Sequence, residues 1–209
     1  MQIAHHGIGS IGGVLLAALS DTDAELVAVA RGESSRMLSQ AGLVLHTPEG
    51  SIEVIPPERF VTVDSEAGPL PAGLRGSCAA ALVCGKANST PILAQIVEEL
   101  LSEDGVAASL QNGMGHAEIL ANRLGKERVL GGTTTHGAWR GEDGTHWVGR
   151  GNIRLGRLDG ADAEPGEAIL CDGCVDDSVL AELFEHALAH LVGAVVLGDF
   201  FTHQEDALI

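Results

Sequence analysis

The residues most suited to chemistry are glycines near the start of the chain, in the run Gly7-Ile8-Gly9-Ser10-Ile11-Gly12. This G-x-G-x-x-G spacing follows a short strand-like start and precedes a helix-like run at residues 14–20. In that context, a strand turns into a helix whose first backbone amides can receive the pyrophosphate of a dinucleotide. Gly7 would allow the tight turn, Gly9 the approach of the phosphates, and Gly12 close packing of the helix. The alternative is an ordinary glycine-rich turn, since the chain has 28 glycines.

The residue after the next predicted strand bears on the choice of dinucleotide. Residues 24–30 are apolar, as in a buried parallel strand, and are followed by Arg31. An acidic residue there would hydrogen-bond the ribose of NAD, whereas an arginine suits the 2′-phosphate of NADP. The alternative is that Arg31 and Arg36 are solvated, and Glu33 weakens the attraction for a phosphate. We expect NADP to be the preferred cofactor.

Composition limits the class of protein. The chain has 209 residues, 45% of them hydrophobic, and no run of eighteen apolar residues, so we expect a soluble protein with no membrane partner. No secretory leader precedes the first predicted strand, and we therefore expect a cytoplasmic location. The chain has 12 Lys and Arg residues but 29 Asp and Glu residues, and the resulting net charge of −17 argues against nucleic-acid binding. Acidic residues in place of surface lysines suggest a halophilic protein. The alternative is an acidic composition without adaptation to salt.

Neither the cysteines nor the histidines show a metal-ligand pattern. The motif Cys171-Asp172-Gly173-Cys174 is a C-x-x-C without a second pair at zinc spacing. Cys78 and Cys84 flank a predicted buried strand, and we expect both to be reduced and to pack as small apolar residues. His186 and His190 lie four residues apart without a carboxylate-rich partner motif, which favours a surface or interface pair. The sequence therefore predicts no metal site.

Strand-like and helix-like segments alternate along the chain, as in a doubly wound, mostly parallel α/β sheet of the Rossmann-like type. Residues 42–46 and 51–54 flank Thr47-Pro48-Glu49-Gly50 and predict a hairpin on the sheet edge. Further along, we expect strands at 79–84 and 106–110, with a helix at 91–101 between them. We place a dinucleotide-binding domain at residues 1–158, and a linker with the start of a C-terminal region at 159–209.

Polar segments follow three successive predicted strands, at residues 85–90, 111–118 and 131–138. In open α/β sheets, ligands bind at the carboxyl ends of the strands. Taken alone, Lys86 could be a surface residue beside a helix, and Asn112-Gly113 could be a plain turn. Their joint occurrence at three strand exits favours one crevice that contains all three segments.

Together these motifs resemble ketopantoate reductase, also called 2-dehydropantoate 2-reductase. The resemblance covers residues 1–158 and rests on the following motifs: the glycine run, Lys86, Leu110-Gln111-Asn112-Gly113-Met114-Gly115, Gly131-Gly132-Thr133-Thr134-Thr135-His136-Gly137-Ala138, the Gly144-Thr145-His146 turn, Gly149-Arg150-Gly151 and Ile153-Arg154-Leu155-Gly156. It implies NADPH-dependent reduction of the small molecule 2-dehydropantoate to (R)-pantoate, a step toward pantothenate and coenzyme A.

The resemblance also implies a role for particular residues. Arg31 would hold the adenosine phosphate, Lys86 would lie on the cofactor side of the cleft, and Ala138 would contact the cofactor through its backbone. Asn112 would touch both the nicotinamide ribose region and the substrate. The pyrophosphate would be held by the glycine run, that is Gly7, Ile8, Gly9, Ser10, Ile11 and Gly12. Hydride transfer to a ketone develops negative charge on its oxygen, so a cation or donor must lie beside it.

The sequence departs from the family after residue 158. Family members continue into a helical domain with a lysine as general acid and a glutamate that helps to bind substrate. Here a helix-like segment at 177–191 and a strand-like segment at 193–197 follow, and no lysine follows Lys126, so we assign no catalytic residue. Three hypotheses stay open: a truncated reductase, a free-standing NADP-binding module that is catalytically dead or completed by another polypeptide, and a different dehydrogenase or non-catalytic sensor. The partners that these hypotheses allow are a second copy of the chain in a homo-oligomer or a polypeptide that supplies the helical domain.

Overall fold

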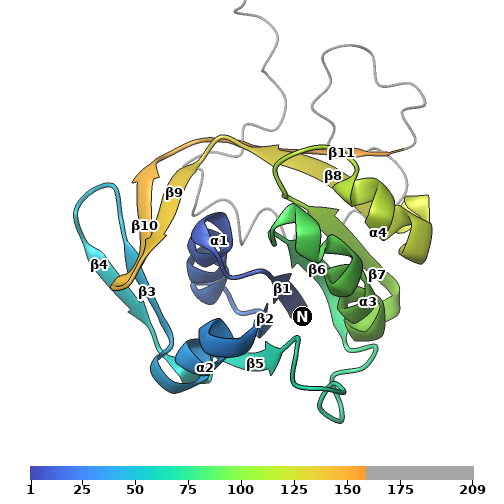
Figure 1. Ribbon diagram of the computed structural model, residues 1–209, viewed down its shortest axis with the longest axis horizontal. Coiled ribbons are helices and arrows are strands. Elements are labelled where there is room, and N and C mark those ends of the chain that lie inside the picture. The colour runs from blue at the N-terminus through green and yellow to red at the C-terminus, as the bar shows by residue number, and fades with distance from the viewer. Residues whose placement is uncertain (159–209) are drawn as a thin grey trace, which may run out of the picture.

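The computed structural model describes residues 1–158 (Figure 1). The segments predicted at 177–191 and 193–197, and the cysteine pair at 171 and 174, lie outside the described residues. The helices are α1 (Ser10–Ser20), α2 (Gly32–Ala41), α3 (Thr90–Leu100) and α4 (His116–Leu124). None of these four is long and apolar enough to span a membrane.

The strands form two sheets. The main sheet has the order β11-β8-β7-β6-β1-β2-β5, and its strands are β1 (Gln2–His6), β2 (Glu25–Ala30), β5 (Phe60–Asp64), β6 (Cys78–Val83), β7 (Leu101–Ser109), β8 (Val129–Thr134) and β11 (Ile153–Arg157). Neighbouring strands are parallel except β11, which pairs antiparallel with β8. The chain winds outward from the central β1 in both directions. This confirms the predicted doubly wound, mostly parallel, Rossmann-like sheet.

The second sheet has four strands in the order β4-β3-β10-β9 and covers α1. Its strands are β3 (Leu43–His46), β4 (Ile52–Ile55), β9 (Gly137–Gly141) and β10 (Gly144–Gly149). Helix α1 therefore lies between two sheets, which is why every residue from Gly12 to Leu19 is buried. Close approach is possible because Gly13 has no side chain: a Cβ there would clash with the hydroxyl of Thr145 on β10.

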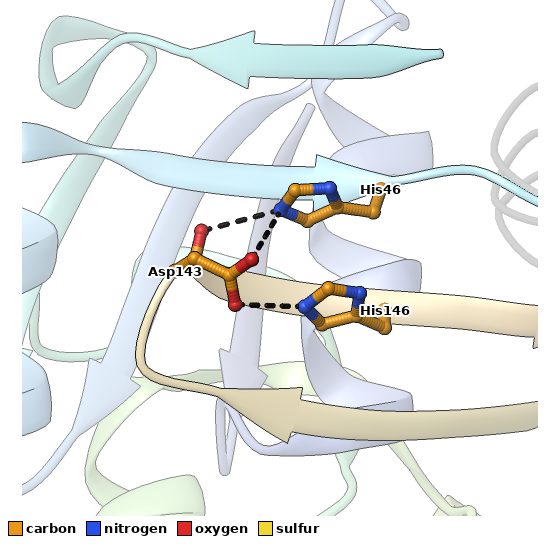
Figure 2. Close-up of side chains that lie close together, drawn as sticks. All are labelled: His46, Asp143 and His146. Carbon is orange, nitrogen blue, oxygen red and sulfur yellow. Dashed lines mark hydrogen bonds and ion pairs between the residues drawn. The ribbon is translucent and has the colours of Figure 1, made fainter. Parts of the chain in front are cut away.

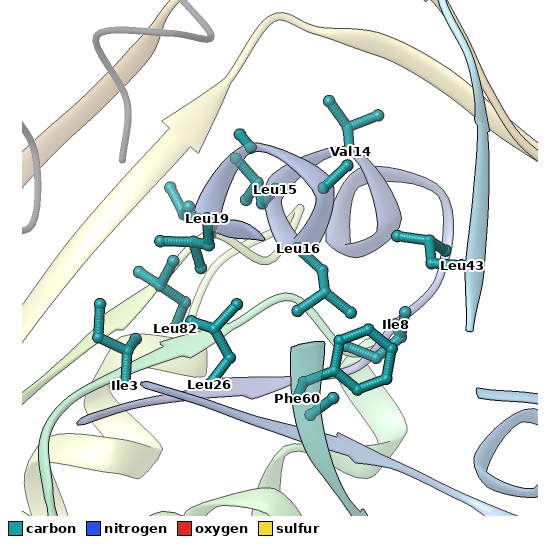
Figure 3. Packing of buried hydrophobic residues seen from close by; sticks show 14 of the residues in the cluster. Ile3, Ile8, Val14, Leu15, Leu16, Leu19, Leu26, Leu43, Phe60 and Leu82 are labelled. Atoms are coloured by element: carbon teal, nitrogen blue, oxygen red, sulfur yellow. The ribbon is translucent and has the colours of Figure 1, made fainter. Parts of the chain in front are cut away.

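Two apolar cores follow from the alternation of side chains along the central strands. Ile3 and Leu26 face α1 and belong to the core that also contains Leu16 and Leu43 (Figure 3). Their neighbours Ala4 and Val27 face the opposite side of the sheet, where α3 and α4 pack. Both faces of the main sheet are thus covered, as the apolar sequence of its strands predicts.

The hairpin at residues 42–54 is present, but the prediction that it lies on the edge of the main sheet is wrong. Strands β3 and β4 pair with each other, and β3 pairs with β10 in the second sheet. The reason is the inward apolar set of Leu43, Leu45 and Ile55, which is buried in the core around α1. An edge position on the main sheet would not cover that face of the helix.

Two further expectations need correction in the same region. Residues 131–134 were expected to follow a strand but lie within β8, and residues 137–138 begin β9, so only residues 135–136 of that polar segment connect the two strands. Residues 144–146 were expected to form a turn but begin strand β10. Glycine and threonine are weak strand signals. Two of the pairings also join distant segments, because β10 pairs with β3 and β8 pairs with β11.

Candidate dinucleotide site

The glycine run forms the turn between β1 and α1. Gly7 has φ +85°, and a Cβ on it would clash with the backbone nitrogen of Gly85. A Cβ on Gly12 would clash with the carbonyl oxygen of Gly7. These two glycines therefore serve the close packing of the loop against the segment after β6 and against its own helix. Gly9 differs, because no atom lies within 4 Å of the place where its Cβ would be.

The N-terminus of α1 is open to a ligand in the same place. Gly9 is the N-cap residue, and no side chain caps the helix. The first amides of an α-helix have no partner within the helix, and the helix dipole favours negative charge there. The residues present therefore fit the diphosphate of a dinucleotide, with open space at Gly9 and free amides behind it.

The two polar segments after β6 and β7 are joined by a buried glutamine. The side-chain nitrogen of Gln111 donates to the carbonyl oxygen of Gly85 at 2.7 Å and to the hydroxyl oxygen of Thr90 at 2.9 Å. The ring nitrogen Nε2 of His116 donates to the carbonyl oxygen of Asn112 at 3.1 Å. These bonds hold the segment of Asn112 against the segment of Lys86. Gln111 belongs to the sequence motif at residues 110–115. Its connecting role depends on contacts with Gly85 and Thr90, which lie 26 and 21 residues away along the chain.

Most of the expected site residues lie at the carboxyl ends of the strands of the main sheet. Lys86 follows Gly85, which touches Gly7, and Asn112 follows Gln111, which bonds to Gly85. The side chains of Lys86 and Asn112 are exposed. Ala138 is partly buried on β9 and packs against the core that contains Ile8. The structure thus brings the glycine run, Lys86, Asn112 and Ala138 into one region.

Arg31 lies at the N-cap of α2, directly after β2, which is the strand beside β1. It is exposed, and within residues 1–158 it forms no ion pair, whereas Arg36 pairs with Glu33. That pairing lowers the pKa of Glu33, through the hydrogen bond from Arg36. The backbone nitrogen of Gly32 donates to Asp64 at 3.1 Å. Asp64 also lines a cavity of 320 Å³ between the end of β5 and α3, together with Leu70, Arg75, Ile92, Ile96 and Glu99.

Arg140 contacts the glycine run and was not predicted. Its Nη1 atom donates to the carbonyl oxygen of Ile8 at 2.8 Å, across 132 residues of sequence. The side chain comes from β9 of the second sheet and places a guanidinium group beside the loop. No local pattern could indicate this contact, because it depends on the second sheet covering α1.

The histidines that precede the glycine run have a structural role. Nε2 of His5 donates to the carbonyl oxygen of Gly12 at 2.8 Å, which ties β1 to the first turn of α1. Burial lowers the pKa of His5 to about 4. Burial and the neighbouring His5 lower the pKa of His6 to about 3. Both rings are therefore neutral at pH 7 and supply no cation to the site.

The cysteines of the described part are also structural. Cys78 and Cys84 are free thiols, Cys78 is buried in the core under α3, and Cys84 packs against the core around α1. Burial raises the pKa of Cys84 to about 12 and also raises the pKa of Cys78. Neither thiol is poised as a nucleophile. The prediction that both are small packing residues is confirmed, and that both are reduced stays a prediction.

The order of the main sheet and the glycine loop together define a Rossmann-like domain. The family model described as "Ketopantoate reductase PanE/ApbA" matches residues 3–160, and the chain belongs to this family. Among curated relatives, it is 28% identical over 167 residues to 2-dehydropantoate 2-reductase of Halobacterium salinarum and 30% identical over 155 residues to that of Archaeoglobus fulgidus. These matches cover 77% and 74% of this chain but only 50% and 46% of the relatives. The chain thus spans about half of their length.

Solved structures agree on the fold. The crystal structure of 2-dehydropantoate 2-reductase from Geobacter metallireducens is similar with a TM-score of 0.68 and 24% identity, over 90% of this chain and 56% of that one. The ternary structure of D-mandelate dehydrogenase with NADH and anilino(oxo)acetate is similar with a TM-score of 0.70 and 18% identity, over 92% and 55%. At these identities the likeness shows the fold alone.

Proposed function

We propose that this chain binds NADPH at the carboxyl edge of the main sheet and serves in the reduction of 2-dehydropantoate to (R)-pantoate, toward pantothenate and coenzyme A. The observation that carries the proposal is the uncapped N-terminus of α1 with open space at Gly9. Family membership supports the same reaction. Two of the curated relatives are named 2-dehydropantoate 2-reductase.

Each end of the cofactor would meet a different group of residues. The amides of residues 10–12 would bind the diphosphate, since the amide of Gly9 already donates to the carbonyl oxygen of Gly7 at 2.8 Å. Arg140 would steady the loop through its bond to the carbonyl oxygen of Ile8. Arg31 would bind the 2′-phosphate, because it is the arginine after β2 that carries no carboxylate partner in the described chain. Lys86, Asn112 and the backbone of Ala138 would line the nicotinamide end.

The bound cofactor would supply the hydride for the ketone. The chain must then stabilise the negative charge that develops on the ketone oxygen. The exposed ammonium of Lys86 can provide positive charge, and the exposed amide of Asn112 can orient both cofactor ribose and substrate through hydrogen bonds. Gln111 would hold the two segments at a constant separation, so that these groups act together.

A proton must also reach the ketone oxygen, and the family resemblance assigns it to a lysine of the helical domain. The 209 residues contain lysine only at Lys86 and Lys126. Since a positioned acid contributes roughly 10²–10⁴-fold to such reactions, we expect the chain alone to bind NADPH and to reduce 2-dehydropantoate slowly. Turnover at about 1–10³ s⁻¹, the rate ordinary for an enzyme, would instead require a donor among the present residues or a second subunit.

Binding is tested with a matched pair of glycine variants. Gly9→Ala and Gly156→Ala each add a methyl group to open space, so both should fold and melt like the parent. Only Gly9→Ala intrudes on the proposed diphosphate position. We expect calorimetric titration to show NADPH binding at least about ten-fold weaker for Gly9→Ala, equal to roughly 1.4 kcal/mol, and unchanged for Gly156→Ala. Equal affinity of both variants would contradict the proposed site.

A further inference from the structure

Two histidines and an aspartate meet on the outer face of the second sheet (Figure 2). His46 ends β3, His146 lies beside it in register on β10, and Asp143 is in the turn between β9 and β10. Their ligand atoms all lie within 4.8 Å of one another. The residues are 97 and 3 positions apart in the sequence, so the spacing along the chain gave no sign of this cluster.

The potential donor atoms of the cluster lie close together. Nε2 of His146 lies 2.8 Å from Oδ1 of Asp143. Nε2 of His46 lies 3.5 Å from Oδ2 and 3.3 Å from the carbonyl oxygen of the same residue. Two imidazole nitrogens and a carboxylate are the donor set that zinc, nickel and copper ions accept. Asp143 is 63% exposed, which leaves room for water ligands.

Stacked rings and a glycine surround the donors. The rings of His46 and His146 stack with centroids 4.1 Å apart, and Trp139 of β9 stacks on the other face of His146 at 3.8 Å. A Cβ on Gly141 would lie 2.6 Å from Oδ1 of Asp143 and 3.2 Å from Nε2 of His146. The missing side chain at residue 141 therefore preserves the gap beside the two donors.

We propose that His46, Asp143 and His146 bind a divalent transition-metal ion of the zinc class, which ties the end of β3 to the β9–β10 hairpin. The two ring planes are within 3° of parallel, so their nitrogen lone pairs run side by side. His46 is 25% exposed, and a rotation of its ring about the Cβ–Cγ bond would turn its Nε2 toward an ion bound by Nε2 of His146. Zinc–nitrogen and zinc–oxygen bonds of about 2.0–2.2 Å fit within the span of the cluster.

The binding experiment must exclude the C-x-x-C motif, because thiolates also bind zinc. We therefore use the full chain with Cys171→Ser and Cys174→Ser as the parent, freed of metal by chelation. Zn²⁺ is added in a calorimeter, and Co²⁺ is added as a spectroscopic probe of the ligands. We expect a single Zn²⁺ per chain and a Co²⁺ spectrum without sulfur-to-metal charge transfer.

Ligand variants then locate the ion. His46→Ala, His146→Ala and Asp143→Asn should each weaken Zn²⁺ binding at least about ten-fold, whereas His116→Ala, at a histidine outside the cluster, should bind like the parent. Zn²⁺ should also raise the melting temperature of the parent but not of Asp143→Asn, an exposed substitution of similar volume that should leave the fold intact. Full binding by the three variants, or loss of all binding in the cysteine-free parent, would overturn the proposal.

Discussion

At the scale of single residues, Arg31 decides the expected choice of cofactor. It extends into solvent after β2, and the neighbouring Arg36 is paired with Glu33. Arg31→Ala should therefore remove most of a preference for NADPH over NADH of about 1–3 kcal/mol, the scale of a charge-assisted phosphate contact. Arg36→Ala removes the same charge nearby and should leave the preference unchanged. Fluorescence titration with NADPH and with NADH measures the preference. Equal affinities for the two nucleotides in the unmodified chain would refute the role of Arg31.

Buried histidines give the fold a defined pH dependence. The pKa values of His5 and His6 are lowered by burial to about 4 and about 3, below the value of about 6.5 for the unfolded chain. Protons therefore bind the unfolded state first as the pH falls below about 6.5, and the free energy of unfolding decreases down to the folded-state pKa values. Each histidine should lower the free energy of unfolding by about 2 kcal/mol between pH 7 and pH 5.

A variant that replaces one of these histidines with a side chain that cannot ionise tests this prediction. His6→Met replaces a fully buried ring with an apolar side chain and should remove about half of the pH dependence in urea denaturation. A slope that is the same in His6→Met and the parent would show that these two histidines do not set the acid sensitivity.

Some site residues could be predicted from sequence and others could not. The glycine run, Lys86 and Asn112 are local signals at strand ends, and the structure brings them together. The contact of Arg140 and the connecting bonds of Gln111 depend on segments that meet only in the folded chain. The cluster of His46, Asp143 and His146 is hidden for the same reason.

At the scale of elements, the second sheet is the part that sequence reasoning placed incorrectly. The hairpin of β3 and β4 has a local turn signal, but its partner β10 is about a hundred residues further along, and nothing local selects between the main sheet and a separate one. The main sheet was predictable because each of its central strands is a short apolar run. The domain boundary at residue 158 stays a prediction.

The second sheet is expected to support cofactor binding through strand β9. Arg140→Met keeps the aliphatic part of the side chain but loses the bond to the carbonyl oxygen of Ile8, so the glycine loop loses a restraint. NADPH binding should weaken by about 1–2 kcal/mol with little change in melting temperature. Arg150→Met removes a charge just after β10, where Arg150 pairs with Glu49, and should bind NADPH like the parent. Calorimetry on both variants provides the comparison, and equal affinities would exclude a positioning role for Arg140.

At the scale of the whole molecule, the described domain belongs to the ketopantoate reductase family and carries the glycine loop. The chain spans about half of the relatives it matches, and one face of its main sheet holds α1 and the second sheet while the other holds α3 and α4. The acidic composition, with a net charge of −17, makes the placement of the few basic groups informative. Lys86 and Arg140 lie at the glycine loop or beside the segment that touches it.

The central claim is that a dinucleotide occupies the carboxyl edge of the main sheet with its diphosphate on α1. Backbone amide NMR of the 209-residue chain during titration with NADPH tests it most directly, because each amide reports its own environment. The largest shifts should occur at Gly9, Ser10 and Ile11, with further shifts at Arg31 and Asn112. Saturable binding with shifts confined to other surfaces, such as β11 or the outer face of the second sheet, would contradict the account, as would the lack of any shift at millimolar NADPH.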